Sequence, residues 1–170
     1  MFPTLTPVDI IVDAAAKPFY REASKNGFER PDYATPGSGA VDLVAMTEYM
    51  LRPGECAPIQ TGIRIHMREP GYVALVLPRS GLGAKQGIVL GNNVGLVDND
   101  YQGPVTCFMW NRTIVEYNPK RFNDKDFHIK VGMRIAQMIF MPLIVAEFNL
   151  VSEFVNQTER GQRGFGSTGA

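Results

Sequence analysis

Apolar and polar positions alternate along this chain in short runs, which is the pattern of β-strands. In the run TGIRIHM, the apolar residues Ile63, Ile65 and Met67 share one face. The polar residues between them, Arg64 and His66, take the other face. Further runs with strand character are DIIV, GYVALVLP, GIVLGN, VTCFMW and DFHIKV. Helical spacing of apolar residues never persists over three turns, so the pattern predicts an all-β domain.

Turn-forming residues separate these runs at short intervals. Clusters of Gly, Pro, Asn and Asp occur in PGSG, RPGE, EPG, GNN and DNDYQGP. Many short strands joined by such turns predict a sandwich or barrel, most simply a jelly roll. Two polar segments, 17–36 and 113–127, are predicted to be loops.

One stretch, PRSGLGAKQG, predicts a short helix. Ser80 stands where an N-cap is expected, and Gly87 is a typical helix stop. A different stretch, IAQMIFMPLIV, is apolar almost throughout and predicts a strand buried on both faces. Such a strand lies in the centre of a sheet or against another subunit, and the sequence leaves both open. Pro142 within it predicts a bulge or a bend.

Length and composition indicate one domain in a reducing compartment. The chain has 170 residues and a formal net charge of zero, which favours neither nucleic acid nor an acidic membrane as a partner. Cys56 and Cys107 are far apart and form no CxxC, so we expect no disulfide framework and no structural zinc site. The N-terminus lacks the pattern of a signal peptide, and no apolar run approaches the ~18 residues of a membrane span. We expect a cytoplasmic protein, or one of the host cytoplasm if the source is a virus.

The helix-forming stretch also carries residues suited to an anion. Arg79 precedes Ser80 at a predicted helix start, where unpaired backbone N–H groups favour negative charge. Gly81 and Gly83 would let a ligand approach the backbone closely. The competing interpretation is that Ser80 only caps the helix, which is the more common role of such a residue.

A second polar stretch, GNNVGLVDNDYQGP, combines an amide, an acid and an aromatic ring. Asn92 can both donate and accept hydrogen bonds, as recognition of a nucleobase requires. Asp98 is a candidate general base, and Tyr101 offers a flat wall for a sugar or base. The competing interpretation is an Asx-rich turn without further function.

Polar residues also interrupt two apolar stretches, and the chain closes on a Gly-rich tail. Asp42 in VDLVA is either exposed at a sheet edge or part of a site, and Gln137 in RIAQMIF is either a site residue or a hydrogen-bonded core amide. The tail ERGQRGFGSTG adds groups that suit a phosphate and a flat ring, or a solvated end: Arg160, Arg163, Phe165, Ser167 and Thr168.

Five stretches, taken in order, resemble the five motifs of the trimeric dUTP diphosphatase (dUTPase) family. They are GSGAVDLVA (37–45), PRSGLGAKQGI (78–88), GNNVGLVDNDYQG (91–103), GMRIAQMIF (132–140) and RGQRGFGSTG (160–169). The similarity runs with gaps from about Tyr33 to Gly169. Two details depart from the usual wording: Gly39 and Ala40 stand in reversed order, and Arg163 is an additional cation.

The resemblance implies a jelly-roll-like β-clip barrel with one short helix after the second motif, assembled as a homotrimer with shared active sites. The β domain would cover residues 1–157, and a mobile Gly-rich arm, 158–170, would close over a neighbouring site. Segments 17–32 and 113–127 would be insertions and could bind a protein partner.

The resemblance also implies Mg2+-dependent hydrolysis of dUTP to dUMP and pyrophosphate. Asp98 would activate the attacking water, and Asp42 would support the metal through water, without a direct protein ligand. The phosphates would be held by a set of polar residues from three motifs: Arg79, Ser80, Gly81, Gln137, Arg160, Ser167 and Thr168. Uracil and deoxyribose would be held by the third motif and the arm: Asn92, Gly95, Val97, Tyr101, Phe165 and Gly166.

Two other functions compete with hydrolysis of dUTP. A dCTP deaminase would share the fold, although the third motif and the tail are of the uracil-specific kind. A nucleotide-sensing protein would bind dUTP and signal through the segments 17–32 or 113–127. A purely structural jelly roll would make five ordered motifs a coincidence.

Overall fold

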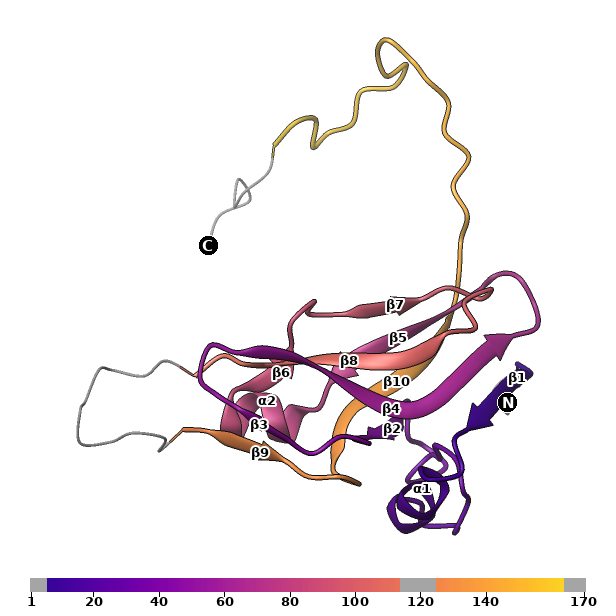
Figure 1. Ribbon diagram of the computed structural model, residues 1–170. Coiled ribbons are helices and arrows are strands. Elements are labelled where there is room, and N and C mark those ends of the chain that lie inside the picture. The colour runs from indigo at the N-terminus through magenta and orange to yellow at the C-terminus, as the bar shows by residue number, and fades with distance from the viewer. Residues whose placement is uncertain (1–5, 114–124, 164–170) are drawn as a thin grey trace, which may run out of the picture.

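Two four-stranded antiparallel sheets form the body of the computed structural model, which describes residues 6–113 and 125–163 (Figure 1). The first sheet has the order β1–β4–β8–β6, with strands Val8–Val12, Cys56–Met67, Pro104–Asn111 and Ile88–Leu90. The second has the order β2–β10–β5–β7, with strands Val41–Val44, Arg134–Pro142, Tyr72–Pro78 and Gly95–Val97. A small third sheet pairs β3 (Tyr49–Leu51) with β9 (Phe127–Ile129). The all-β prediction is confirmed.

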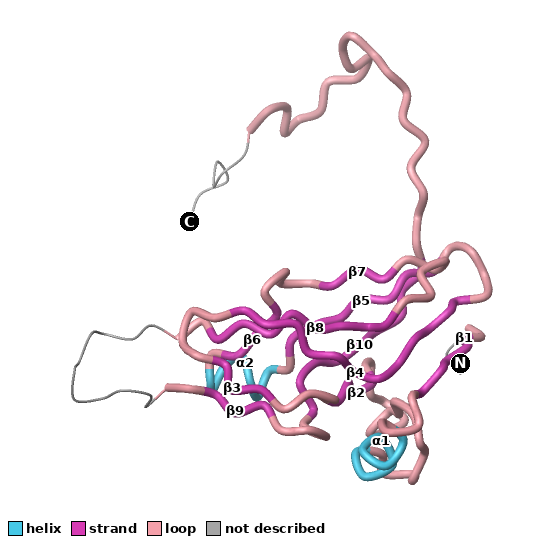
Figure 2. The backbone as a smooth tube through the Cα atoms, viewed as in Figure 1, coloured by secondary structure: helices cyan, strands magenta, loops and turns pink. Residues whose placement is uncertain are grey.

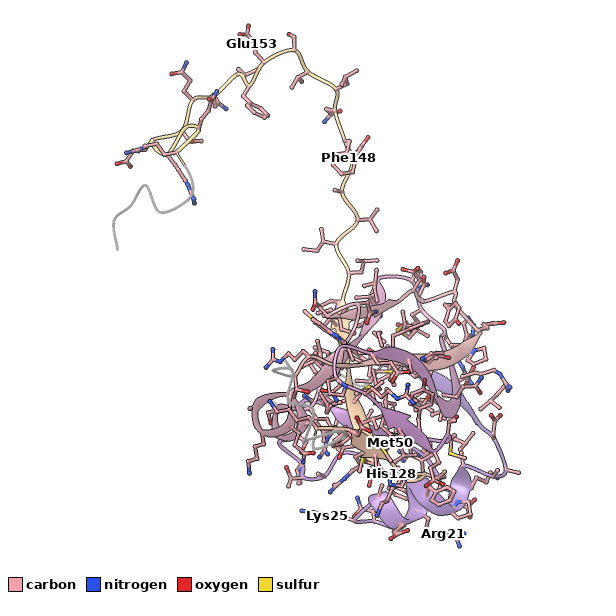
Figure 3. The ribbon with its side chains drawn as sticks, turned by 60° about the vertical axis from the view of Figure 1, so that its left-hand side comes forward. Arg21, Lys25, Met50, His128, Phe148 and Glu153 are labelled. Atoms are coloured by element: carbon pink, nitrogen blue, oxygen red, sulfur yellow. The ribbon has the colours of Figure 1, made fainter. Side chains whose placement is uncertain are left out.

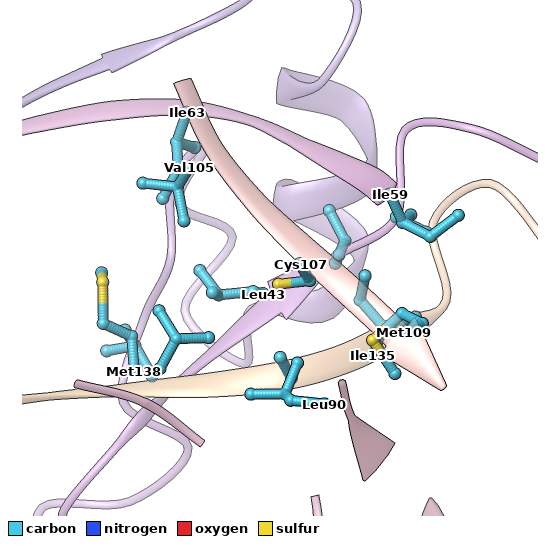
Figure 4. Packing of buried hydrophobic residues seen from close by; sticks show 14 of the residues in the cluster. Leu43, Ile59, Ile63, Leu90, Val105, Cys107, Met109, Ile135 and Met138 are labelled. Atoms are coloured by element: carbon cyan, nitrogen blue, oxygen red, sulfur yellow. The ribbon is translucent and has the colours of Figure 1, made fainter. Parts of the chain in front are cut away.

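The hydrophobic core lies between the two large sheets. The close view in Figure 4 shows residues of both sheets meeting: Leu43, Ile59, Ile63, Leu90, Val105, Cys107, Met109, Ile135 and Met138. Each is at most 3% exposed. The alternation predicted for β4 is confirmed, since Ile63, Ile65 and Met67 are buried and the polar residues between them are not.

The segment 17–36 is not all loop, so the prediction of a single helix was wrong. It begins with α1 (Lys17–Ala23), which stands out beside the strands in Figure 2. Seven residues are too few to show a helical periodicity, and Pro18 fits the first turn of such a helix. Tertiary packing holds it instead: Tyr20 is 1% exposed, and its hydroxyl donates to the Thr61 carbonyl oxygen at 2.9 Å.

The predicted second-motif helix is present as α2 (Ser80–Gln86), with one correction at its start. Arg79, not Ser80, is the N-cap residue, because Arg79 has extended backbone angles and Ser80 is already helical. No side chain caps this end. The predicted stop is confirmed, since Gly87 has φ 71° and its N–H donates to the Leu82 carbonyl oxygen.

Strand β10 is central in its sheet, between β2 and β5, but it is shorter than its apolar run. Ile135, Ala136 and Met138 are buried, whereas the first residue and the last two are exposed, so the prediction of burial on both faces holds only in part. Pro142 is the last residue of the strand and pairs with Tyr72. The irregularity expected there lies instead between Arg134 and Ala136, in the pairing with β2.

Residues 143–163 leave the body without forming a helix or strand. Figures 1 and 3 show this segment, with Phe148 and Glu153, extending away from the sheets. Large apolar side chains along it are strongly exposed: Ile144, Val145, Phe148, Leu150, Phe154 and Val155. A single chain therefore leaves an extended apolar segment uncovered.

The predicted insertion 113–127 is anchored where it leaves and rejoins the body. Asn111 is fully buried, and its side-chain N–H group donates to the carbonyl oxygens of Leu51 (3.1 Å) and Lys125 (2.9 Å). Its Oδ1 accepts from the Thr113 hydroxyl at 2.6 Å. The side chain thus ties both ends of the segment to β3.

Candidate active site

One hollow collects the residues predicted for phosphates. Four of them, Arg79, Ser80, Gly81 and Gln137, line a space of about 330 Å³ together with Asp42, the residue predicted to support the metal. The structure therefore brings together three motifs that lie almost a hundred residues apart in the chain. Asp32, Ser38, Gly39 and other residues before β2 complete the wall. Sequence reasoning missed Asp32, which lies in a segment without strand or motif character, and Ser38, which lies in the first motif but was assigned no role. We name this space the phosphate hollow.

Three neighbouring strands place these side chains. Asp42 on β2 pairs in register with Gln137 on β10, which pairs in turn with Leu77 on β5. Arg79 follows the end of β5 directly and begins α2. The Gln137 side-chain N–H group donates to the Pro78 carbonyl oxygen at 3.0 Å, so this half-buried amide has the partner that burial demands.

Asp42 forms ion pairs with two arginines. Its Oδ1 lies 2.8 Å from Arg79 Nε, and its Oδ2 lies 3.4 Å from Arg134 Nη1. Arg79 Nη1 also donates to the Arg134 carbonyl oxygen at 3.2 Å. Side-chain exposures of 23% for Asp42 and 29% for Arg79 leave both within reach of a ligand. Arg134 was absent from the predicted site, although a cation opening an apolar strand could have indicated it.

A second hollow, of about 370 Å³, collects residues of the third motif. Asn92, Gly95, Val97 and Tyr101 line it together with β8 residues, and we name it the nucleoside hollow. At Gly95 a Cβ would lie 3.2 Å from Val76 Cβ, which is a tight contact, and 3.6 Å from Asn92 Nδ2, so the backbone of Gly95 lies close to the amide. The Tyr101 hydroxyl donates to the Pro104 carbonyl oxygen at 3.1 Å, which fixes the ring beside this hollow.

Asp98 follows β7 at the edge of the same turn. Its carbonyl oxygen accepts from the Tyr101 N–H at 3.2 Å, and the residue is exposed. Within residues 6–113 and 125–163 its carboxylate makes no ion pair or hydrogen bond. A free, solvated carboxylate of this kind can accept a proton from water.

The two hollows share no lining residue, and the described part of the arm, residues 158–163, lines neither of them. Arg160 is exposed and donates through Nε to the Arg163 carbonyl oxygen at 3.1 Å, within the arm itself. The other arm residues predicted for the site, Phe165, Gly166, Ser167 and Thr168, lie outside the described residues. Within a single chain, the described residues predicted for the phosphates and those predicted for the nucleoside therefore line two different hollows.

In the described part of the chain, no three His, Cys, Asp or Glu side chains come together in a way that could hold a metal ion. None of the helices found there is long and apolar enough to cross a membrane.

An arginine-bearing polar hollow suits phosphates, and a hollow that offers an amide beside an aromatic ring suits a base and its sugar, so the site is that of a nucleotide-binding protein. Comparison with known sequences agrees and is more specific. The chain belongs to the dUTPase family, whose model matches residues 26–169.

Named relatives and solved structures support this assignment. The chain is 49% identical over 144 residues to a deoxyuridine 5'-triphosphate nucleotidohydrolase of Actinobacillus succinogenes, covering 84% of this chain and 88% of the relative. It is 51% identical over 146 residues to that of Mannheimia succiniciproducens, covering 85% and 89%. The dUTPase of Staphylococcus bacteriophage 80alpha, solved with dUPNHPP, has the same fold, with a TM-score of 0.74, 24% identity and coverage of 96% and 99%.

A second solved structure with this fold is a mutant dUTPase from phage phi11 of S. aureus, described as coordinating a structural Mg(II) ion. Its TM-score is 0.71 at 20% identity, and the match covers 88% of this chain and 99% of the phage protein. At this identity the likeness establishes the shared fold only.

Proposed function

We propose that this protein hydrolyses dUTP to dUMP and pyrophosphate. The names of relatives about 50% identical over most of the chain support this reaction. The observation that carries the proposal is the pair of hollows, one lined by residues suited to phosphates and the other by an amide and a ring suited to a nucleoside. In a cell, such an activity would lower dUTP, keep uracil out of DNA and supply dUMP for dTTP synthesis.

The active protein is a homotrimer with sites shared between subunits. Because the two hollows are separate on one chain, a single nucleotide is held by the phosphate hollow of one subunit and the nucleoside hollow of another. The arm of the remaining subunit closes over it. The exposed apolar side chains of 143–155 support association, since contact with a second copy would remove them from water.

The phosphate hollow positions the triphosphate. Arg79 keeps its charge at any working pH and can bind phosphate oxygens through parallel N–H bonds. Gln137, Ser80 and the backbone at Gly81 add neutral donors, and the arm adds Arg160, Ser167 and Thr168. A triphosphate needs positioning and charge stabilisation more than covalent chemistry from the protein.

Asp98 activates the water. Its carboxylate takes a proton from the water as the water oxygen bonds to the α-phosphorus. The bond from this phosphorus to the bridging oxygen breaks, and pyrophosphate leaves with that oxygen and the electron pair. The attack therefore occurs at the junction of two subunits, next to the sugar and phosphate.

The nucleoside hollow selects uracil and deoxyribose. Asn92, with backbone groups of the hairpin at Gly95 and Val97, hydrogen-bonds the uracil edge. Tyr101 packs under the deoxyribose and leaves no room for a 2′-hydroxyl. Phe165 stacks on the base from the arm, with Gly166 allowing close approach. A site built on such hydrogen bonds rejects a base that leaves its buried polar groups unpaired.

The described residues fit a Mg2+ ion that is held mainly by the substrate. Asp42 offers hard oxygen ligands in the phosphate hollow, where it would support the ion through water. When bound, Mg2+ neutralises charge on the triphosphate. Arg134, which also contacts Asp42, keeps that carboxylate oriented toward the hollow.

The cytoplasm is the proposed compartment, which the two free thiols Cys56 and Cys107 support. A protein partner at 17–32 or 113–127 stays a prediction. The first of these segments is partly occupied by α1, which packs on the body through Tyr20.

Release of pyrophosphate from dUTP with Mg2+ tests the proposal, run beside dCTP, dTTP and UTP. We expect turnover of dUTP alone, and loss of at least ~100-fold in kcat for Asp98→Asn. Asp100→Asn, two residues away in the same turn, is the matched control and should retain activity. Folded protein that releases no pyrophosphate from dUTP would refute the proposal, and ammonia released from dCTP would favour a deaminase.

A further inference from the structure

The ring of Tyr101 lies against the backbone of Gly103, two residues further along the same turn. The hydroxyl donates to the Pro104 carbonyl oxygen at 3.1 Å, and the Tyr101 N–H donates to the Asp98 carbonyl oxygen at 3.2 Å. The side chain therefore folds back over its own turn, although the residue is 44% exposed. Its position is set before any ligand arrives.

The Tyr101 ring occupies the space that a side chain at position 103 would need. A Cβ at this position would lie 2.4 Å from Tyr101 Oη, 2.6 Å from Cζ and 2.9 Å from Cε2. Gly103 is not among the glycines with a positive φ, so its backbone conformation gives no reason for glycine. The contact with the ring is the reason that the structure offers.

We propose that Gly103 is a positioning residue that determines sugar specificity. Its missing side chain gives the Tyr101 ring room beside the nucleoside hollow, and the position of the ring decides whether a 2′-hydroxyl has room. This inference rests on the proposed function, in which Tyr101 packs under the deoxyribose. In this inference Gly103 touches no substrate and acts only by positioning the ring that excludes a 2′-hydroxyl.

The size of the displacement follows from contact distances. Carbon atoms pack at about 3.5–4.0 Å, so a methyl group at Gly103 would move the hydroxyl end of the ring by about 1 Å. The hydrogen bond to Pro104 would then be lost, and the half-exposed ring would swing toward solvent without unfolding the domain. Room would open beside C2′ of the sugar, while packing against deoxyribose would weaken.

Gly103→Ala, assayed with dUTP and UTP, tests the inference. We expect the ratio of kcat/KM for dUTP to that for UTP to fall by about tenfold or more, mainly through a higher KM for dUTP. Gly37→Ala is the control, since Gly37 has no positive φ and nothing lies within 4 Å of a Cβ there. It should leave the ratio unchanged.

A double-mutant cycle with Tyr101→Ala shows whether the effect passes through the ring. In the Tyr101→Ala background, Gly103→Ala should not lower the ratio further. An unchanged ratio in Gly103→Ala alone, with a wild type that selects dUTP, overturns this inference and leaves the proposed function standing. The inference is also overturned if Gly103→Ala lowers the ratio in the Tyr101→Ala background by the same factor as in the wild type. A wild type that neither binds nor hydrolyses either nucleotide overturns both.

Discussion

At Gly62 a single added methyl group is expected to destabilise the fold. Gly62 lies in β4 where the pairing with β8 shifts between Gln60 and Arg64, and it has φ 69°. A Cβ there would lie 2.6 Å from Ala16 Cβ and 2.9 Å from Met46 Cγ. The Met46 side chain can turn aside, whereas the Ala16 methyl group, which is fully buried, moves only with its backbone.

A substitution at Gly62 has a backbone cost and a steric cost, and a comparison with Gly54 distinguishes the two. A left-handed backbone costs a residue with a Cβ about 1–2 kcal/mol. Forcing a methyl group into a packed core costs about 1–3 kcal/mol more. Gly54 has φ 80° with nothing within 4 Å of a Cβ, so Gly54→Ala has the first cost alone. We expect Gly62→Ala to lower the free energy of unfolding by about 2–5 kcal/mol and Gly54→Ala by about 1–2.

Denaturant unfolding of both variants and the wild type measures these free energies. All three are compared at one protein concentration, because association of copies makes apparent stability depend on it. Equal destabilisation by the two variants would refute the steric part of the reasoning. A loss at Gly62 without any loss at Gly54 would refute the backbone part.

Two further predictions concern ionisable groups. Burial raises the pKa of the Cys107 thiol to about 12, whereas Cys56 is exposed, so a thiol reagent near pH 8 should label one cysteine per native chain and two after unfolding. Rapid labelling of both in the native state would contradict this. Partial burial raises the pKa of Asp32, but hydrogen bonds from Ser24 and Asn26 lower it more, so the net pKa is below the usual value. Asp32 therefore stabilises the fold above its ordinary pKa near 4, and this contribution is lost as pH falls through the lowered pKa. The thermal stability of Asp32→Asn should lie below that of the wild type at pH 7, with the gap closing below about pH 4; a gap that persists in acid would contradict the assignment.

Several elements could be predicted from the sequence because their determinants are local. Short apolar runs between turn-forming residues predicted β1, β5, β6, β8 and β9, alternation predicted β4, and Gly87 marked the end of α2. Strand β3 was not predicted; it is held by pairing with β9, which lies far along the chain. Helix α1 escaped because its seven residues are too few to show a helical period, and its stability comes from Tyr20 packing on a strand 41 residues further along the chain.

The sequence by itself determined the fold class, the family resemblance and the identity of most candidate site residues, since these depend on residue type and order. Only the tertiary structure decided how they assemble. Arg134 reaches Asp42 across 92 residues because β10 pairs with β2, and nothing local to either residue indicates that register. The separation of the two hollows was likewise decided by folding. Distances between residues far apart in the chain are set by packing that no short stretch of sequence contains.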